Sequence, residues 1–260
     1  MKINKVIMLL GCVALAVAVF AGEALAVRGP QGVANTSHNL STSGNIAPSN
    51  NEDEICVFCH TPHGSSTDGP LWNRNNSSVV YTHYTSSTLS TFVASTRTAN
   101  VNPESMLCLS CHDGSISMYT VINPTNDVGQ PTPAVGDGTM RDGFLNIQGP
   151  KIGQGRNPDG TVNPVSNDLS DDHPISFKYQ AVHDDTSKNN AARLHTIAEA
   201  EAAGVRFLPE NAPDADKRVE CSSCHDPHVD YGIFTGDPNY KPFLITPNTG
   251  SALCLACHIK

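Results

Sequence analysis

The chain has 260 residues, and its 25 Asp and Glu outnumber its 16 Lys and Arg, which gives a formal net charge of −9. This acidity argues against nucleic acid and anionic lipid as partners. Aromatic residues make up only 6 % of the chain, while Gly and Pro number 20 and 18. We therefore expect mostly irregular coil with short α-helices, little β structure and a small apolar core.

Residues 1–26 have the pattern of a secretory signal peptide. An apolar run over residues 6–21 follows two lysines, and Ala24-Leu25-Ala26 precede the expected cleavage point. A lipid anchor on Cys12 is the alternative, but the apolar stretch before it is short. We expect the mature chain to be exported to the extracellular space or cell surface, or alternatively to the periplasm. No stable membrane span is expected.

Four copies of the pattern Cys-x-x-Cys-His occur, and their first cysteines are 52, 113 and 33 residues apart. The pattern is typical of c-type haem attachment, because two thiols can add to the vinyl groups of one haem while the histidine binds its iron. The sequence therefore predicts four haem c groups. The predicted thioether cysteines are Cys56, Cys59, Cys108, Cys111, Cys221, Cys224, Cys254 and Cys257, and the predicted proximal iron ligands are His60, His112, His225 and His258.

Zinc and disulfide bonds are the alternative uses of paired cysteines in such a chain. Neither explains why a histidine follows all four pairs in a chain with only 11 histidines. Removal of the signal peptide also removes Cys12, and the haem motifs use all eight remaining cysteines. The pattern favours haem over both alternatives.

We expect one tetrahaem cytochrome domain over residues 27–260, with the haems forming its core. It would consist of an N-terminal haem pair at about 27–122, a loop-rich linker at about 123–172 and a C-terminal part at about 173–260. The linker is rich in Pro, Gly, Asn and Asp, which favour turns. Gly153-Gln-Gly155 within it lacks the third glycine of a dinucleotide site.

The Ala- and Glu-rich segment 189–203 predicts the longest helix, with Thr186 or Ser187 as its cap and Gly204 after its end. Other helices should be single turns that carry the Cys-x-x-Cys-His motifs. A short piece at 78–84 is the best candidate for a strand.

A filled sixth position on each iron favours electron transfer, whereas an open one permits catalysis. Seven histidines are available beyond the proximal ones. His63 and His228 each follow a proximal histidine by three residues, a tether too short to pass around the edge of that haem. Each is therefore expected to bind a different haem. His38 and His173 lie in flexible polar segments and complete the predicted distal set.

The other histidines, His83, His183 and His195, are expected to be surface or packing residues. Met106, Met118 and Met140 are alternative ligands, which the excess of histidine makes unnecessary.

The chain resembles the multihaem cytochromes with doubled Cys-x-x-Cys-His motifs. In order and spacing it is most similar to the OmcE-like tetrahaem cytochromes of the outer surface, which polymerise into conducting filaments. The resemblance implies two histidines on every iron and a distal histidine that can come from the neighbouring subunit, a role for an early residue such as His38. Residues 189–203 look like an insertion relative to that family. The segments that carry the resemblance are Ile55-Cys-Val-Phe-Cys-His-Thr-Pro-His63, Leu107-Cys-Leu-Ser-Cys-His-Asp-Gly114, Asp172-His-Pro-Ile-Ser-Phe177, Cys221-Ser-Ser-Cys-His-Asp-Pro-His228 and Leu253-Cys-Leu-Ala-Cys-His258.

The expected function is electron transfer without bond-making chemistry, so the protein is not expected to be an enzyme. Its partners would be redox proteins or extracellular electron acceptors, together with further copies of itself in a homopolymer. A soluble periplasmic shuttle is the alternative arrangement. A reductase of a small oxyanion and a structural fibre or haem store are the competing functional classes.

Overall fold

The computed structural model describes residues 32–98, 100–113, 115–125, 129–134, 140–141, 144–145, 152 and 167–260. The expected signal peptide, Cys12 and Gly153-Gln-Gly155 lie outside the described residues, as does much of the expected linker. In the part of the chain that the structure describes, no helix is long and apolar enough to cross a membrane.

Regular structure is sparse, and the expectation of mostly coil with short helices and little sheet is confirmed. The α-helices are α2 (Thr91–Thr96), α3 (Pro103–His112), α4 (Tyr179–His183), α5 (Ile197–Ala202), α6 (Tyr231–Thr235) and α7 (Ala252–Leu255). Single 3-10 turns are η1 (Val33–Asn35), η2 (Cys56–Phe58), η4 (Asn190–Ala192), η5 (Asp214–Asp216), η6 (Cys221–Ser223), η7 (Pro238–Tyr240) and η8 (Thr249–Ser251).

Strands of two residues form three small pairs. β1 (Thr82–His83) runs parallel to β4 (Asp168–Leu169), which confirms a strand within the expected piece at 78–84. β2 (Met140–Arg141) is antiparallel to β3 (Phe144–Leu145), and β5 (Phe177–Lys178) is antiparallel to β6 (Arg218–Val219).

The prediction of one long helix over 189–203 is wrong. Asn189 adopts the left-handed conformation with φ 53° and precedes η4, and the chain then leaves the helical path where Leu194 forms a β-bridge with His258. Thr196 begins α5 instead, through a capping box with Glu199. The expected cap at Thr186 or Ser187 is therefore also wrong.

The longest described helix is α3, with ten residues, and it carries the second Cys-x-x-Cys-His motif. Pro103 occupies the first turn, where a backbone N–H would have no partner within the helix, so its absence loses no hydrogen bond. The negative charge of Glu104 interacts favourably with the positive end of the helix dipole. This motif consequently lies on a full helix rather than on the expected single turn.

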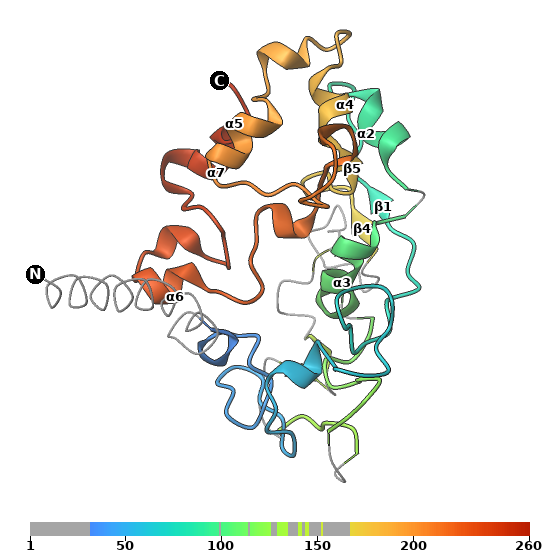
Figure 1. Cartoon of the computed structure of the whole chain (residues 1–260), viewed down its shortest axis with the longest axis vertical. Coiled ribbons are helices and arrows are strands. Elements are labelled where there is room, and N and C mark those ends of the chain that lie inside the picture. The colour runs from blue at the N-terminus through green and yellow to red at the C-terminus, as the bar shows by residue number, and fades with distance from the viewer. Residues whose placement is uncertain are drawn as a thin grey trace, which may run out of the picture.

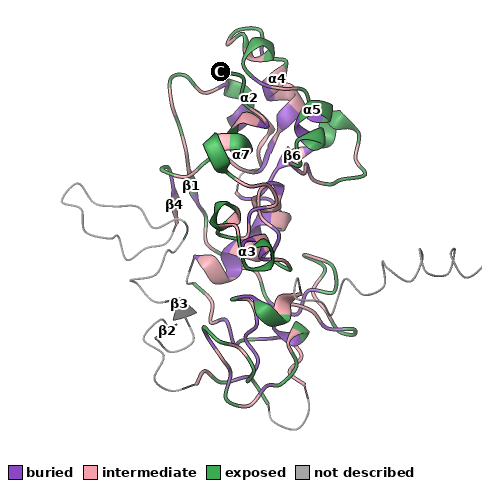
Figure 2. Ribbon diagram, turned by 90° about the vertical axis from the view of Figure 1, so that its left-hand side faces the viewer, coloured by how far each residue is buried: buried purple, intermediate pink, exposed green. Residues whose placement is uncertain are grey.

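Among the described residues, three small apolar clusters are buried. Figure 2 shows buried residues in purple around α3, α4 and β6. The largest cluster joins α2, α4 and α5, which lie together at the top of Figure 1, and includes the fully buried Phe207. A second cluster surrounds the first motif through Val57 and Phe58, and a third packs Leu109 of α3 against Tyr81. The clusters include residues of the first, second and fourth motifs.

Candidate functional site

Each Cys-x-x-Cys-His motif forms one helical turn. In the first, third and fourth motifs, the histidine N–H donates to the carbonyl of the first cysteine, over 2.8, 3.1 and 2.9 Å. The turns belong to η2, η6 and α7, while the second motif continues α3. Residues four apart on a helix share one face, so this turn places the first cysteine and the histidine on the same side. The eight cysteines of the motifs form no disulfide with one another.

Three histidine pairs face one another across gaps of similar width. The ring centroids lie 6.0 Å apart for His38 and His112, 6.1 Å for His60 and His228, and 6.4 Å for His173 and His258. For comparison, the rings of His38 and Phe243, which are in direct contact, are 4.6 Å apart. Other aromatic pairs lie at the same distances as the histidine pairs, since the rings of His60 and Trp72 are 6.0 Å apart and those of Phe58 and Tyr119 are 6.1 Å apart.

The width of these gaps fits two imidazoles that bind one metal from opposite sides. Two bonds of about 2 Å and two half-rings of about 1 Å give a centroid distance of about 6 Å. Aromatic side chains can also pack at such distances, so the distance alone does not decide. Every pair, however, joins one predicted proximal ligand to one predicted distal ligand. The residues present therefore fit axial ligation of a haem iron.

Hydrogen bonds to backbone carbonyls fix the tautomer of several of these histidines. His60 Nδ1 lies 2.8 Å from the Pro70 carbonyl oxygen, and His225 Nδ1 lies 2.8 Å from that of Pro242. A carbonyl can only accept, so Nδ1 carries a proton, and the neutral tautomer selected by this contact is the one with the lone pair on Nε2. This is the arrangement by which an outer hydrogen bond orients a ligating histidine.

Two of the predicted distal histidines are oriented in the same way. His38 Nδ1 lies 2.8 Å from the Pro227 carbonyl, and His173 Nδ1 lies 2.8 Å from that of Pro174. Burial lowers the pKa of His38, and burial with His38 beside it lowers the pKa of His112 to about 4. Both rings are therefore neutral at pH 7, the state that binds metal.

His228 has a different outer partner. Its Nδ1 is 3.6 Å from Asp226 Oδ1, and Asp226 also pairs with Arg206 at 3.2 Å. Residues 225–228 thus contact three candidate sites: His225 belongs to the third motif, the Pro227 carbonyl orients His38, and His228 faces His60. The Asp226 contact was missed from sequence, although the His-Asp-Pro-His pattern contained it. No sequence pattern near Pro70 or Pro242 indicates that their carbonyls would accept hydrogen bonds from His60 and His225.

His225 and His63 remain outside the three pairs. All histidines of the chain lie in the described residues, and within them no ring contact joins His225 to another histidine. His63 is exposed. The resemblance implied a role for His38 as a donor to a neighbouring subunit, which stays a prediction; within the single chain its ring lies 6.0 Å from that of His112.

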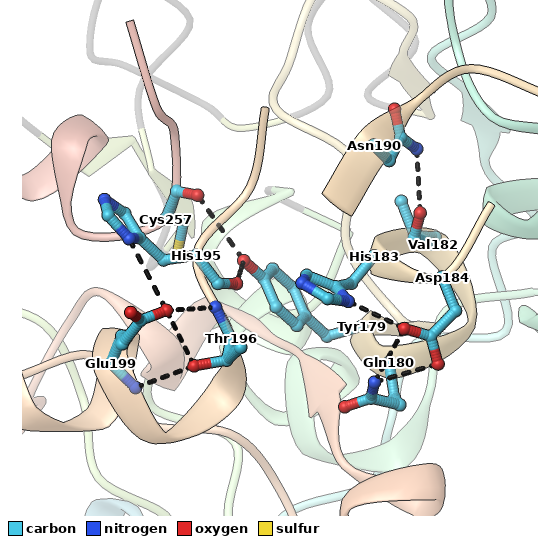
Figure 3. A network of polar contacts seen from close by, with 10 residues as sticks. All are labelled: Tyr179, Gln180, Val182, His183, Asp184, Asn190, His195, Thr196, Glu199 and Cys257. Atoms are coloured by element: carbon cyan, nitrogen blue, oxygen red, sulfur yellow. Dashed lines mark hydrogen bonds and ion pairs between the residues drawn. The ribbon is translucent and has the colours of Figure 1, made fainter. Parts of the chain in front are cut away.

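The histidines predicted to be surface or packing residues have other surroundings (Figure 3). His183 Nδ1 lies 2.7 Å from Asp184, and His195 Nδ1 lies 3.6 Å from Glu199. The Tyr179 hydroxyl donates to the carbonyl of His195 over 2.7 Å. His83 has a buried Nε2 without a partner in the described part of the chain, and burial lowers its pKa to about 4.

The cysteines of successive motifs lie near one another. Burial, with the Cys111 thiol nearby, raises the pKa of Cys59 to about 12, and burial with Cys257 nearby raises that of Cys224 to about 11. A hydrogen bond with the Cys221 thiol raises the pKa of Cys108. Each motif therefore lies close in space to the next motif along the chain.

Among the described residues, no group of three or more His, Cys, Asp or Glu could hold a metal ion by itself. A haem iron needs only two protein ligands, because the macrocycle supplies the others. Comparison with known proteins found no protein-family model that matches the chain and no matching curated protein.

Proposed function

We propose that this protein transfers electrons through four covalently attached c-type haems. The observation that carries the proposal is the set of three histidine pairs, each of which joins the histidine of a Cys-x-x-Cys-His motif to a second histidine at 6.0–6.4 Å. A haem iron with two histidine ligands exchanges one electron and leaves no open position for a substrate. The chain supplies thioether anchors, axial ligands and the outer hydrogen bonds that orient them.

The neighbouring cysteines support a linear order of haems along the chain's own motif order. Cys59 is near Cys111, Cys108 is near Cys221, and Cys224 is near Cys257. Such a row would let an electron enter at one end of the molecule and leave at the other. The buried macrocycles would also supply much of the core, since the apolar clusters of the protein are small.

The unpaired His225 and the exposed His63 favour assembly into a homopolymer. We assign His63 of one copy as the second ligand to the iron held by His225 of the next copy. A head-to-tail contact of this kind generates a filament when successive copies do not close into a ring, and we propose the open, filamentous arrangement. By the resemblance to the OmcE-like filaments, we further propose that the assembled protein lies on the cell surface or outside the cell. Extracellular acceptors or redox proteins would take the electrons.

The first experiment is electron cryo-microscopy of the haem-loaded protein, purified from the cell exterior without detergent. The proposal expects helical fibres with a continuous row of haems and a His63 ligand that crosses subunits. The variant His63→Ala should abolish the fibres and leave one high-spin haem per chain. His195→Ala, which alters a histidine outside the pairs, is the matched control and should retain both fibres and spectrum.

Other outcomes separate the competing functions. Discrete particles with four low-spin haems, each ligated within one chain, would replace the filament with a periplasmic shuttle. A wild-type haem at His225 that binds cyanide or nitric oxide would favour a reductase of a small oxyanion instead. Protein without covalently bound haem after export would refute the proposed function altogether.

A further inference from the structure

A buried carboxylate lies at the junction between the second and third motifs. Glu220 is 1 % exposed and directly precedes Cys221 of the third motif. Its Oε1 accepts from Asn102 Nδ2 over 2.8 Å, and its Oε2 accepts from the hydroxyls of Ser105 and Ser176 over 2.5 and 3.0 Å. Ser223 completes a capping box with Glu220. We call these five residues the Glu220 cluster.

Backbone groups fix the direction of the two hydroxyl protons. The Cys221 N–H donates to Ser105 Oγ over 3.0 Å, and the Asn102 N–H donates to Ser176 Oγ over 3.0 Å. Each hydroxyl already accepts, so its own proton is free to point at Glu220. The carboxylate is thus surrounded by donors, and no Lys or Arg pairs with it in the described residues.

Backbone strain accompanies this arrangement at Ser176. Its φ is 64°, in the left-handed region that residues with a side chain rarely adopt. Glycine would adopt this conformation without strain. A serine at this position supplies the hydroxyl that donates a hydrogen bond to Glu220. Backbone strain of this kind is retained where the surrounding structure requires it.

The Glu220 cluster joins segments that are far apart in the sequence. Asn102 is the N-cap of α3 and Ser105 lies in its first turn, whereas Ser176 precedes β5 and Ser223 belongs to η6. Cys108 follows Ser105 by three residues, on the same side of α3. The cluster therefore holds the start of α3 against η6, next to the contact between the Cys108 and Cys221 thiols.

From this geometry we infer that Glu220 is a positioning residue for electron transfer between the haems of the second and third motifs. The inference rests on the proposed function. The rate of electron tunnelling between two haems falls steeply as the distance between them increases. The Glu220 cluster, which holds the two motifs together, would therefore set this rate. Because the expected haem order passes from the second motif to the third, this junction connects the N-terminal and C-terminal halves of the row.

The test compares three variants of the full haem-loaded protein. Glu220→Gln keeps the shape of the side chain but replaces one carboxylate oxygen by an NH₂ group. That NH₂ group then faces at least one of the present donors, which are the Asn102 amide and two serine hydroxyls, so at least one hydrogen bond is lost. Ser176→Ala removes one donor and leaves the carboxylate. Asp185→Asn is the matched control, because Asp185 is equally a buried carboxylate that accepts from serine hydroxyls, but it precedes no haem motif.

The readout is the re-equilibration of electrons among the haems after rapid photoreduction, with spectra that count low-spin haems. We expect Glu220→Gln to retain four low-spin haems and to lose the fast phase, Ser176→Ala to slow it, and Asp185→Asn to leave it unchanged. An unchanged fast phase in Glu220→Gln, or equal slowing in Asp185→Asn, would overturn the inference. If Glu220→Gln does not accumulate, Ser176→Ala decides on the same criterion. Failure of the proposed function itself would appear in the wild type, as missing haem.

Discussion

The angles between paired imidazole planes predict which haem gives which electron paramagnetic resonance signal. His60 and His228 are nearly parallel, with an interplanar angle of 16°, whereas the other two pairs stand at 82° and 75°. Two parallel imidazoles act on the same iron d orbital and split the pair of orbitals strongly, which gives a rhombic low-spin signal. Two perpendicular imidazoles act on both orbitals equally and give a strongly axial signal with a large maximum g value.

Of the four proposed haems, the three whose ligand pairs lie within one chain should therefore give one rhombic signal, from the first motif, and two strongly axial signals, from the second and fourth. Replacement of His228 by alanine should remove the rhombic signal and convert one haem of the four to high spin. His38→Ala should instead remove an axial signal. His183→Ala, a histidine bonded to Asp184, should leave every signal in place. Loss of an axial signal in His228→Ala would refute the pairing derived from the ring geometry.

Two further predictions concern stability. Thr196→Ala removes the side chain that accepts from the Glu199 N–H, so the free energy of unfolding should fall by about 1 kcal/mol, as measured by denaturant titration; no change would mean that α5 contributes nothing to the cooperative unit. Hydrogen bonds from Ser187 and Ser90 lower the pKa of Asp185, so its contribution is present above the unfolded pKa of about 4 and is lost as the pH falls through the folded value. Asp185→Asn should be less stable than the wild type at pH 7, and the difference should shrink in acid; a constant difference would contradict this assignment.

The low content of regular structure could be predicted from composition, but the helices could not be placed correctly. Gly204 was correctly expected after the end of α5, since its φ of 99° is a local requirement that glycine meets. The break before α5 depends on the bridge between Leu194 and His258, which is a tertiary contact without local signal. The start of α3, in contrast, could have been predicted from the sequence, because Pro103 and Glu104 are typical of the first turn of a helix. The expectation of a single turn at the haem motif took no account of them.

The motif residues of the candidate site follow from the sequence because their spacing is a single helical turn. Their partners do not, since His228 reaches His60 only through the packing of distant segments. The tether argument for His228 excludes its own motif, and the structure shows that its ring faces that of His60 in the first motif. For His38 the polar arm names no partner, whereas the structure places its Nδ1 2.8 Å from the Pro227 carbonyl oxygen.

Residues 225–228 also constrain the order in which the protein can mature. His38 and its carbonyl partner Pro227 are 189 residues apart, so this contact closes a very long loop. Contacts of such high sequence separation form late and slow the folding of a domain. Under the proposed ligation, the first haem would wait with one empty axial face until nearly the whole chain had emerged from the export machinery. The N-terminal part would therefore be most vulnerable to proteolysis and to foreign ligands during biogenesis, and a chain cut short before residue 225 would remain permanently immature.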